Sequence, residues 1–121
     1  MSKIAIVILN WNGKSFLEKF LPSVIQHNHP DAEIIIADND SNDDSIAFLQ
    51  NKYPEIRIIK NNKNYGFAGG YNEALKHVNA TYYILLNSDI EVSPNWIDPI
   101  VDYMEKNPDV AAFQPKILSY S

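Results

Sequence analysis

The sequence predicts an α/β domain with a mostly parallel sheet and helices on both faces. Short apolar runs alternate along the chain with longer segments in which apolar residues recur every three or four positions. The first apolar run, residues 4–9, is unbroken and rich in β-branched residues, which is typical of a strand covered on both faces. A polar cluster follows each of the first four predicted strands. Strands that alternate with helices imply right-handed crossovers between parallel neighbours.

The first strand is followed by a predicted helix at about residues 14–26. Its apolar face comprises Phe16, Leu17, Phe20, Leu21, Val24 and Ile25. Pro22 lies inside this helix and predicts a kink, because proline removes one helical hydrogen bond. A turn at residues 28–31 leads into a second buried strand at residues 33–37.

The second strand precedes a helix that is expected to end before Pro54. Ser41 or Asn42 is the predicted N-cap of this helix. Asp43 and Asp44 are placed in its first turn, where negative charge is favourable.

The second half of the chain repeats the same alternation. A helix is predicted at about residues 68–78, and another begins with Ser93 as N-cap and Pro94 in the first turn. The inward face of that last helix comprises Ile97, Ile100, Val101 and Met104. Further strands are predicted at residues 56–59, 82–86 and 110–113.

Composition places limits on the class of protein. With 121 residues, 45% hydrophobic and 21% charged, the chain (residues 1–121) is expected to form a single globular domain. The net charge of −5 argues against a nucleic acid as partner. A phosphate-containing ligand would therefore need a metal ion or backbone N–H groups to compensate its charge.

The absence of cysteine and of a membrane-spanning apolar run indicates where in the cell the chain is expected. The chain has no cysteine, which fits a reducing environment. The apolar run at residues 4–9 is too short to span a membrane. The chain is expected to be cytoplasmic, and membrane association of the full-length protein would come from outside this segment.

The polar clusters indicate where a ligand binds. They cover residues 10–13, 38–41, 61–66 and 87–89 and follow the first four strands. Because parallel strands end at the same edge of a sheet, these clusters are expected to form one crevice, and ligands of open α/β sheets bind at that edge.

Several residues of these clusters have suitable chemistry. Asp89 could bind a hard divalent cation that also takes phosphate oxygens, and Asn87 could coordinate it through its carbonyl. Trp11 could stack on a nucleobase. The glycine-rich segment at residues 66–70 begins a helix and would let the backbone approach a phosphate.

Other nucleotide-binding motifs are absent. The segment after the first strand lacks G-x-G-x-x-G, and the chain contains no G-x-x-x-x-G-K-[ST]. Asn10 and Asn12 are amides where a phosphoacceptor domain needs acids. His27 and His29 are expected to be solvated loop residues at the opposite edge of the sheet, and His77 a helix-surface residue.

Four segments together resemble a known family. They are VILNWNG at residues 7–13, EIIIADNDSND at 33–43, NYGFAGGYN at 64–72 and YILLNSD at 83–89. In their order and spacing across about residues 4–118 they resemble family 2 glycosyltransferases, in particular the rhamnosyltransferase-like branch. The resemblance implies a GT-A-type fold that binds a nucleoside-diphosphate sugar.

The resemblance also implies residue roles. Asp89 falls at the metal-binding carboxylate of the family's D-x-D motif, with Mg²⁺ or Mn²⁺ as the expected ion, and Asn87 departs from the acid usual at the first position. Asp38 and Asn39 fall where the family contacts the nucleobase, and Trp11 where an aromatic ring lies against it. The residues expected to bind the nucleotide sugar are Asn10, Trp11, Asn12, Asp38, Asn39, Asn64, Gly66, Phe67, Gly69, Asn72, Asn87 and Ser88.

The implied reaction is inverting, metal-dependent transfer of a sugar to a hydroxyl of a glycan or a lipid-linked saccharide. No catalytic base is assigned, because the acids after Asp89 are expected on a helix surface; they are Glu91, Asp98, Asp102, Glu105 and Asp109. Residues 114–118 resemble the point where the family enters its acceptor half. The chain is therefore expected to be a truncated N-terminal donor-binding portion, inactive alone, whose exposed apolar surface could support oligomerisation.

Two alternatives remain open at this stage. A nucleotidyltransferase-like domain would favour a nucleoside triphosphate and need basic residues near the glycine-rich segment, where only Lys63 is evident. A stand-alone binding or assembly module would be non-enzymatic.

Overall fold

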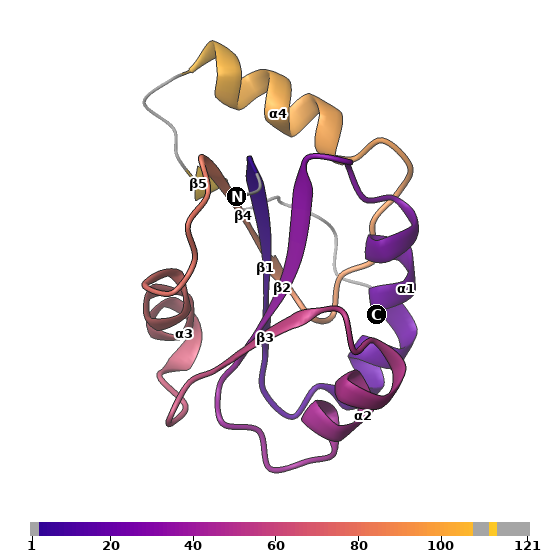
Figure 1. Cartoon of the computed structure of the whole chain (residues 1–121), viewed down its shortest axis with the longest axis vertical. Helices are drawn as coiled ribbons and strands as arrows, with labels where there is room; N and C mark the ends of the chain where they lie inside the picture. Colours follow the sequence, from indigo (N-terminus) through magenta and orange to yellow (C-terminus); the bar gives the residue numbers. More distant parts are fainter. Residues whose placement is uncertain (1–2, 108–111, 114–121) are drawn as a thin grey trace.

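The computed structural model describes residues 3–107 and 112–113 (Figure 1). Strands and helices alternate along these residues, as predicted. Their bounds are β1 Ile4–Asn10, α1 Lys14–Gln26, β2 Ala32–Asp38, α2 Ser45–Lys52, β3 Arg57–Lys60, α3 Gly66–Leu75, β4 Tyr82–Asn87, α4 Ile97–Lys106 and β5 Ala112–Phe113.

The described strands form one parallel sheet in the order β3-β2-β1-β4-β5. The register sets Asn10 opposite Asp38 and Leu9 opposite Asn87. Asp38 in turn lies opposite Lys60 at the end of β3. The strands therefore end nearly level, and the polar residues that follow them are brought to one edge.

Helices cover both faces of the sheet, which confirms the predicted α/β architecture. On one face, Ile4, Ile6 and Ile8 of β1 belong to a buried cluster with residues of α1, α2 and α4. On the other face, Ala5 and Val7 pack in a second cluster with α3. Figure 1 shows α3 on one side of the sheet and α1 and α2 on the other, with α4 near the amino ends of the strands.

The helix α1 has the predicted bounds and continues through Pro22. Its buried residues are Leu17, Phe20, Leu21 and Val24. The prediction that Phe16 and Ile25 also point inward is wrong, because 46% and 36% of their surfaces are exposed. Both residues lie at the margins of the apolar stripe, where the helix surface turns away from the sheet.

The predicted starts of two helices are wrong. The helix α2 begins at Ser45, with Asp44 as N-cap, so Ser41 and Asn42 do not cap it and Asp43 precedes its first turn. The Asp43 carboxylate instead accepts the backbone N–H of Ser45, with an N–O distance of 3.0 Å.

The helix α4 begins at Ile97 and not at Ser93-Pro94. Asn95 has φ of 60°, which places it in the left-handed region and prevents a helix from continuing through it. Val101 is half-buried, whereas the other three predicted inward residues of α4 are buried.

The remaining boundaries differ by a few residues. The helix α3 begins at Gly66, two residues before its predicted start, and ends at Leu75. The strand β5 covers residues 112–113, while the predicted strand residues 110–111 lie outside the described part of the chain. Within that part, every helix is too short or too polar to cross a lipid bilayer.

We expect Leu21→Ala to lower the free energy of unfolding by roughly 2–5 kcal/mol, because it leaves a cavity under α1. Leu21 is 2% exposed, whereas Ile25 on the same helix is 36% exposed. Urea denaturation should therefore show a clearly smaller loss for Ile25→Ala. Equal losses would contradict the packing of α1 described above.

Candidate functional site

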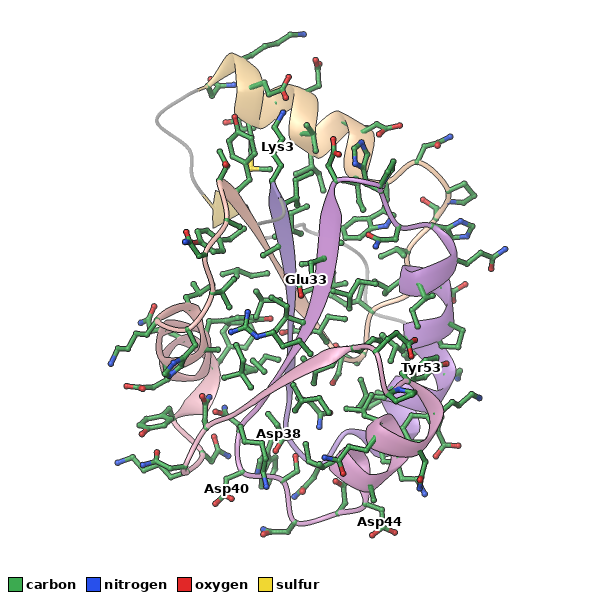
Figure 2. The ribbon with its side chains drawn as sticks, viewed as in Figure 1. Lys3, Glu33, Asp38, Asp40, Asp44 and Tyr53 are labelled. Atoms are coloured by element: carbon green, nitrogen blue, oxygen red, sulfur yellow. The ribbon has the colours of Figure 1, made fainter. Side chains whose placement is uncertain are left out.

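The polar residues that follow β1, β2, β3 and β4 lie together at the carboxyl edge of the sheet. Figure 2 shows Asp38, Asp40 and Asp44 at this edge and Lys3 at the other. Hydrogen bonds link the residues after β1 to those after β2, and the residues after β2 to those after β3. The predicted gathering of polar residues at one edge of the sheet is confirmed, whereas a crevice between them stays a prediction.

Asn10 and Asp38 form the buried centre of this edge, and both are 0% exposed. The amide nitrogen of Asn10 donates to Asp38 Oδ1 at 2.9 Å and to Ser41 Oγ at 3.3 Å. Asp38 Oδ1 also accepts the Ser41 hydroxyl at 2.7 Å, and Asp38 Oδ2 accepts the Ser41 N–H at 2.9 Å. The buried carboxylate is thus satisfied by three donors of the chain.

The side-chain carbonyl oxygen of Asn10, Oδ1, is buried and has no hydrogen-bond partner among the described residues. It faces Gly13: a Cβ atom on Gly13 would lie 2.5 Å from this oxygen and 3.0 Å from Ser88 Oγ. Glycine at position 13 is therefore what lets β1, the start of α1 and the end of β4 approach one another.

Asn39 is the centre of a second buried network. Its amide nitrogen donates to Gly66 O at 2.9 Å and to Asn64 Oδ1 at 3.2 Å, and its carbonyl accepts Asn61 Nδ2 at 2.8 Å. Asn61 also donates to Gly70 O at 3.2 Å. Asn39 therefore fixes the loop between β3 and α3.

The network around Asn39 gives the glycine-rich segment a structural role, because Gly70 packs against Asn39. A Cβ atom on Gly70 would lie 2.6 Å from Asn39 Nδ2 and 2.8 Å from Leu9 Cδ1, so Gly70 admits the Asn39 side chain. Gly66 has φ of 78° and open space where a side chain would be, so the backbone conformation requires glycine there. A Cβ atom on Gly69 would meet Tyr65 Cβ at 3.0 Å.

Tyr71 of α3 reaches the end of β4. It is 3% exposed, and its hydroxyl lies 2.8 Å from Leu86 O, to which it donates, and 3.2 Å from Asn87 Oδ1. Burial raises the pKa of Tyr71 above its usual range, and the nearby Asp89 carboxylate raises it further, against the opposing effect of the Leu9 backbone N–H. Tyr71 therefore stays neutral, donates its one hydroxyl proton to Leu86 O and lies close to the Asn87 carbonyl.

Asp89 differs from the other acids of the edge. Its side chain is half-buried. Within residues 3–107 and 112–113, its carboxylate has no hydrogen bond or ion pair. Asp89 is thus a carboxylate that remains available to a ligand.

Two aromatic side chains near the carboxyl edge of the sheet are exposed. Trp11, directly after β1, is 52% exposed, and Phe67 in the first turn of α3 is 48% exposed. The Phe67 ring packs edge-on against Tyr71, with 5.2 Å between ring centroids. Asn72, one position after Tyr71, is exposed on α3. All three are accessible, and their predicted contact with a nucleotide sugar stays a prediction.

Asn12 and Asp43 connect the loop after β1 with the loop after β2. Asn12 Oδ1 accepts the N–H groups of Asn42 at 2.6 Å and Asp43 at 3.2 Å. Asp43 Oδ2 accepts the N–H of Lys14 at 3.2 Å. Burial raises the pKa of Asp43, but hydrogen bonds from Ser45 and Lys14 outweigh it and leave the pKa below its usual value, so the carboxylate stays ionised.

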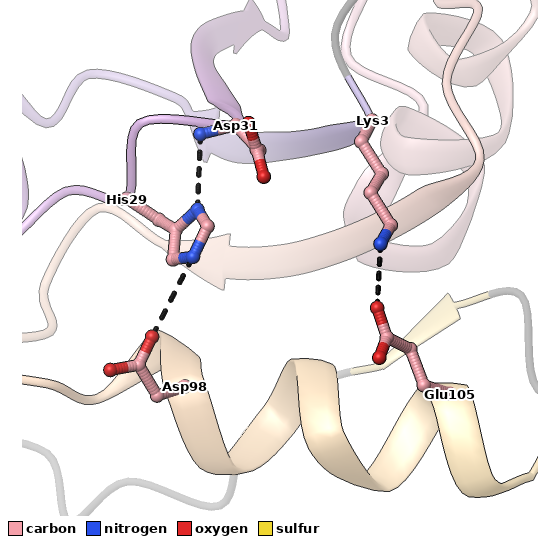
Figure 3. A network of polar contacts seen from close by, with 5 residues as sticks. All are labelled: Lys3, His29, Asp31, Asp98 and Glu105. Carbon is pink, nitrogen blue, oxygen red and sulfur yellow. Dashed lines mark hydrogen bonds and ion pairs between the residues drawn. The ribbon is translucent and has the colours of Figure 1, made fainter.

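His29 is not the solvated loop residue that the sequence predicts. Its Nε2 lies 3.6 Å from Asp98 Oδ1 and its Nδ1 accepts the N–H of Asp31 at 3.0 Å, because α4 packs against the turn after α1 (Figure 3). Lys3, just before β1, forms an ion pair with Glu105 of α4 at 2.5 Å. His29 does lie away from the carboxyl edge, and His77 is exposed, as predicted.

Several residues of the edge were missed by sequence analysis as site residues: Gly13, Ser41, Asp43, Asn61, Gly70 and Tyr71. Asn61 and Ser41 lie in the polar clusters, and nothing else in the sequence marks them as site residues. Gly70 and Tyr71 belong to a resembling segment but act through contacts with β1, β2 and β4 that no local pattern specifies.

The fold defines the class of protein. The described fold is shared with S. aureus TarS residues 1–349 in complex with UDP-GlcNAc (TM-score 0.73, 18% identity, 86% of this chain and 31% of that chain). It is also shared with the mannosyltransferase PcManGT from Pyrobaculum calidifontis in complex with GDP-Man and Mn²⁺ (TM-score 0.73, 15% identity, 84% and 32% of the chains). The chain has a GT-A fold, the fold of these glycosyltransferases.

The sequence profile of Glycosyl transferase family 2 matches residues 5–119, so the chain belongs to this family. A beta-1,3-glucosyltransferase of Escherichia coli, WfaP, is 36% identical over 91 residues (74% of this chain, 36% of its own length). An N-acetylglucosaminyl-diphospho-decaprenol L-rhamnosyltransferase of Mycobacterium tuberculosis is 22% identical over 125 residues (94% and 41%). The chain therefore spans little more than a third of the length of such relatives.

We expect Gly70→Ala to be less stable than Gly69→Ala by about 1–3 kcal/mol, the usual cost of overpacking. Both substitutions gain the same helix propensity, so that contribution cancels in the comparison. Only the methyl group on Gly70 meets Asn39 and Leu9. Chemical denaturation of the two variants measures the difference, and equal stability would show that Asn39 can move aside.

Proposed function

We propose that this chain supplies the donor site of an enzyme that transfers a sugar from a nucleoside-diphosphate sugar to an acceptor hydroxyl. The observation that carries the proposal is the carboxyl edge of the sheet, where exposed Trp11 and half-buried Asp89 flank buried amide networks. Family membership supports it. The structural neighbours named above bind UDP-GlcNAc and GDP-Man, which also supports it.

In this proposal Trp11 stacks on the nucleobase, because a half-exposed indole offers a flat apolar face. Asp38 and Asn39 were expected to contact the base directly. Since their polar atoms are bonded within the chain, we propose that they shape the base pocket from beneath.

A divalent cation fits the acidic residue at this edge. Mg²⁺ and Mn²⁺ prefer oxygen ligands and commonly combine one or two carboxylates with phosphate oxygens. Asp89 offers a carboxylate without a hydrogen-bond or ion-pair partner among the described residues, whereas the Asn87 carbonyl faces Tyr71. Asp89 would hold the ion together with ligand oxygens, and the ion would supply Lewis-acid stabilisation of negative charge on the diphosphate. The neighbour PcManGT was obtained with Mn²⁺.

The acids that follow Asp89 do not provide a base at this edge. Asp98 lies near His29, Glu105 near Lys3 and Asp102 near Lys106, and all three acids are on the exposed surface of α4, as predicted. Glu91 is exposed, and Asp109 lies outside the described residues. An inverting transfer needs a general base, which we place in a part of the enzyme beyond the described residues.

The acceptor class follows from relatives. The E. coli and M. tuberculosis relatives carry names that specify undecaprenol- and decaprenol-diphosphate saccharides as acceptors. We therefore propose a glycan or lipid-linked saccharide as acceptor. Membrane association would then serve access to such a lipid.

Thermal stabilisation of the chain by UDP, dTDP, GDP and ATP, each with and without Mn²⁺, tests the donor site. A nucleotide at 100 times its Kd stabilises by about 2.7 kcal/mol. We expect a Mn²⁺-dependent shift with one diphosphate, and we expect Asp89→Asn to abolish the Mn²⁺-dependent part. A variant that keeps this dependence would refute Asp89 as the metal ligand, and a shift with ATP alone would favour a nucleotidyltransferase.

We expect Trp11→Ala to weaken nucleotide binding by about 1–3 kcal/mol, the contribution of stacking between a base and an aromatic ring. Isothermal titration calorimetry measures the change. Tyr103→Ala serves as the control, because Tyr103 is a 49% exposed aromatic residue on α4. If the two variants bind equally well, the base does not lie on Trp11.

A further inference from the structure

The loop after β1, which contains Trp11, and the loop after β2 are joined by hydrogen bonds that run in both directions. Asn12 of the first loop binds two backbone N–H groups of the second, those of Asn42 and Asp43. Asp43 of the second loop binds the N–H of Lys14, at the start of α1. Asn12 also donates its own backbone N–H to Ser41 Oγ at 2.9 Å.

Each side chain in this arrangement uses oxygen atoms to hold backbone donors of the other loop. Asp43 Oδ1 is occupied as well, by the N–H of Ser45 at 3.0 Å. Both carboxylate oxygens of Asp43, and the carbonyl of Asn12, are therefore committed to the protein. The Asn12 carbonyl and Asp43 Oδ1 each accept two donors of the chain, and Asp43 Oδ2 accepts one.

The backbone at Asn12 adopts an unusual conformation. Its φ is 50°, in the left-handed region that asparagine tolerates better than most residues other than glycine. This turn comes directly after Trp11, which is 52% exposed, and two residues after Asn10, which is 0% exposed. An indole with half of its surface exposed is restrained by packing less than a buried ring, so the backbone that carries it contributes more to its position.

We propose that Asn12 and Asp43 form a clamp whose role is to position Trp11 for ligand binding. The clamp holds the loop after β1 against the loop after β2 and so fixes the direction in which the indole leaves the sheet edge. Asn12, which the sequence places among the residues that bind the nucleotide sugar, is in this proposal a positioning residue. The link to binding rests on the proposed function of Trp11 as the stacking residue.

The clamp can be tested without any ligand. The chain has two tryptophans, so Trp96→Phe leaves Trp11 as the only indole. Time-resolved fluorescence anisotropy then reports the local motion of Trp11, at a temperature where circular dichroism shows native secondary structure. We expect Asn12→Gly, which keeps the left-handed backbone but removes the side chain, to increase that motion.

Asp43→Ala should have the same effect, and the double variant should add little to either single one. Residues that act as one unit show such non-additive behaviour, whereas independent residues add. Asp44→Ala is the matched control, because Asp44 is the adjacent exposed acid and makes no capping hydrogen bond. Unchanged Trp11 motion in Asn12→Gly, or additive effects, would overturn the clamp.

Binding of UDP, dTDP and GDP with Mn²⁺ to the same variants tests the consequence. If the competent Trp11 position falls to about a tenth of the population, the apparent Kd rises about tenfold. Increased Trp11 motion with an unchanged Kd would support the clamp but overturn Trp11 as the ligand contact. If the parent chain binds no nucleotide, the proposed donor site is refuted. The anisotropy measurement of Trp11 motion still tests the clamp, because it needs no ligand.

Discussion

The buried hydrogen bond between Asn10 and Asp38 is the interaction on which the candidate site depends. A carboxylate that is 0% exposed would be strongly destabilising without donors around it. Asn10 supplies one donor from the neighbouring strand, and Ser41 supplies two from the following loop. Satisfying Asp38 therefore brings the ends of β1 and β2 together and fixes the course of the chain up to Ser41.

The other residues at this edge are of two kinds: buried ones that hold the loops in place, and accessible ones. The buried residues are two amides and a tyrosine. Asn39 and Asn61 hold the loop before α3, and Tyr71 holds the end of β4. Trp11 remains exposed, and Asp89 is half-buried without a partner among the described residues. In the proposed function Trp11 would contact a flat part of the ligand, and Asp89 would contact an anionic part only through a bound cation.

Much of the site was predictable, and the failures have a common cause. The polar clusters at residues 10–13 and 87–89 could be assigned to one edge because parallel strands end together. Their individual roles could not, because an exposed loop residue and a buried network residue have the same local pattern. Asn39 and Trp11 both follow strands closely, yet one is 2% and the other 52% exposed.

The sequence by itself determined the order of elements, the two-sided covering of the sheet and the edge at which polar residues gather. These follow from local periodicity and from the handedness of strand crossovers. Only the tertiary structure decided which polar atoms pair: Asn39 with Asn61, Asn12 with the backbone at Asp43, and His29 with Asp98. Such pairs depend on strand register and on how helices pack over the sheet. Both are set by the burial of side chains from distant segments, and local pattern does not specify them.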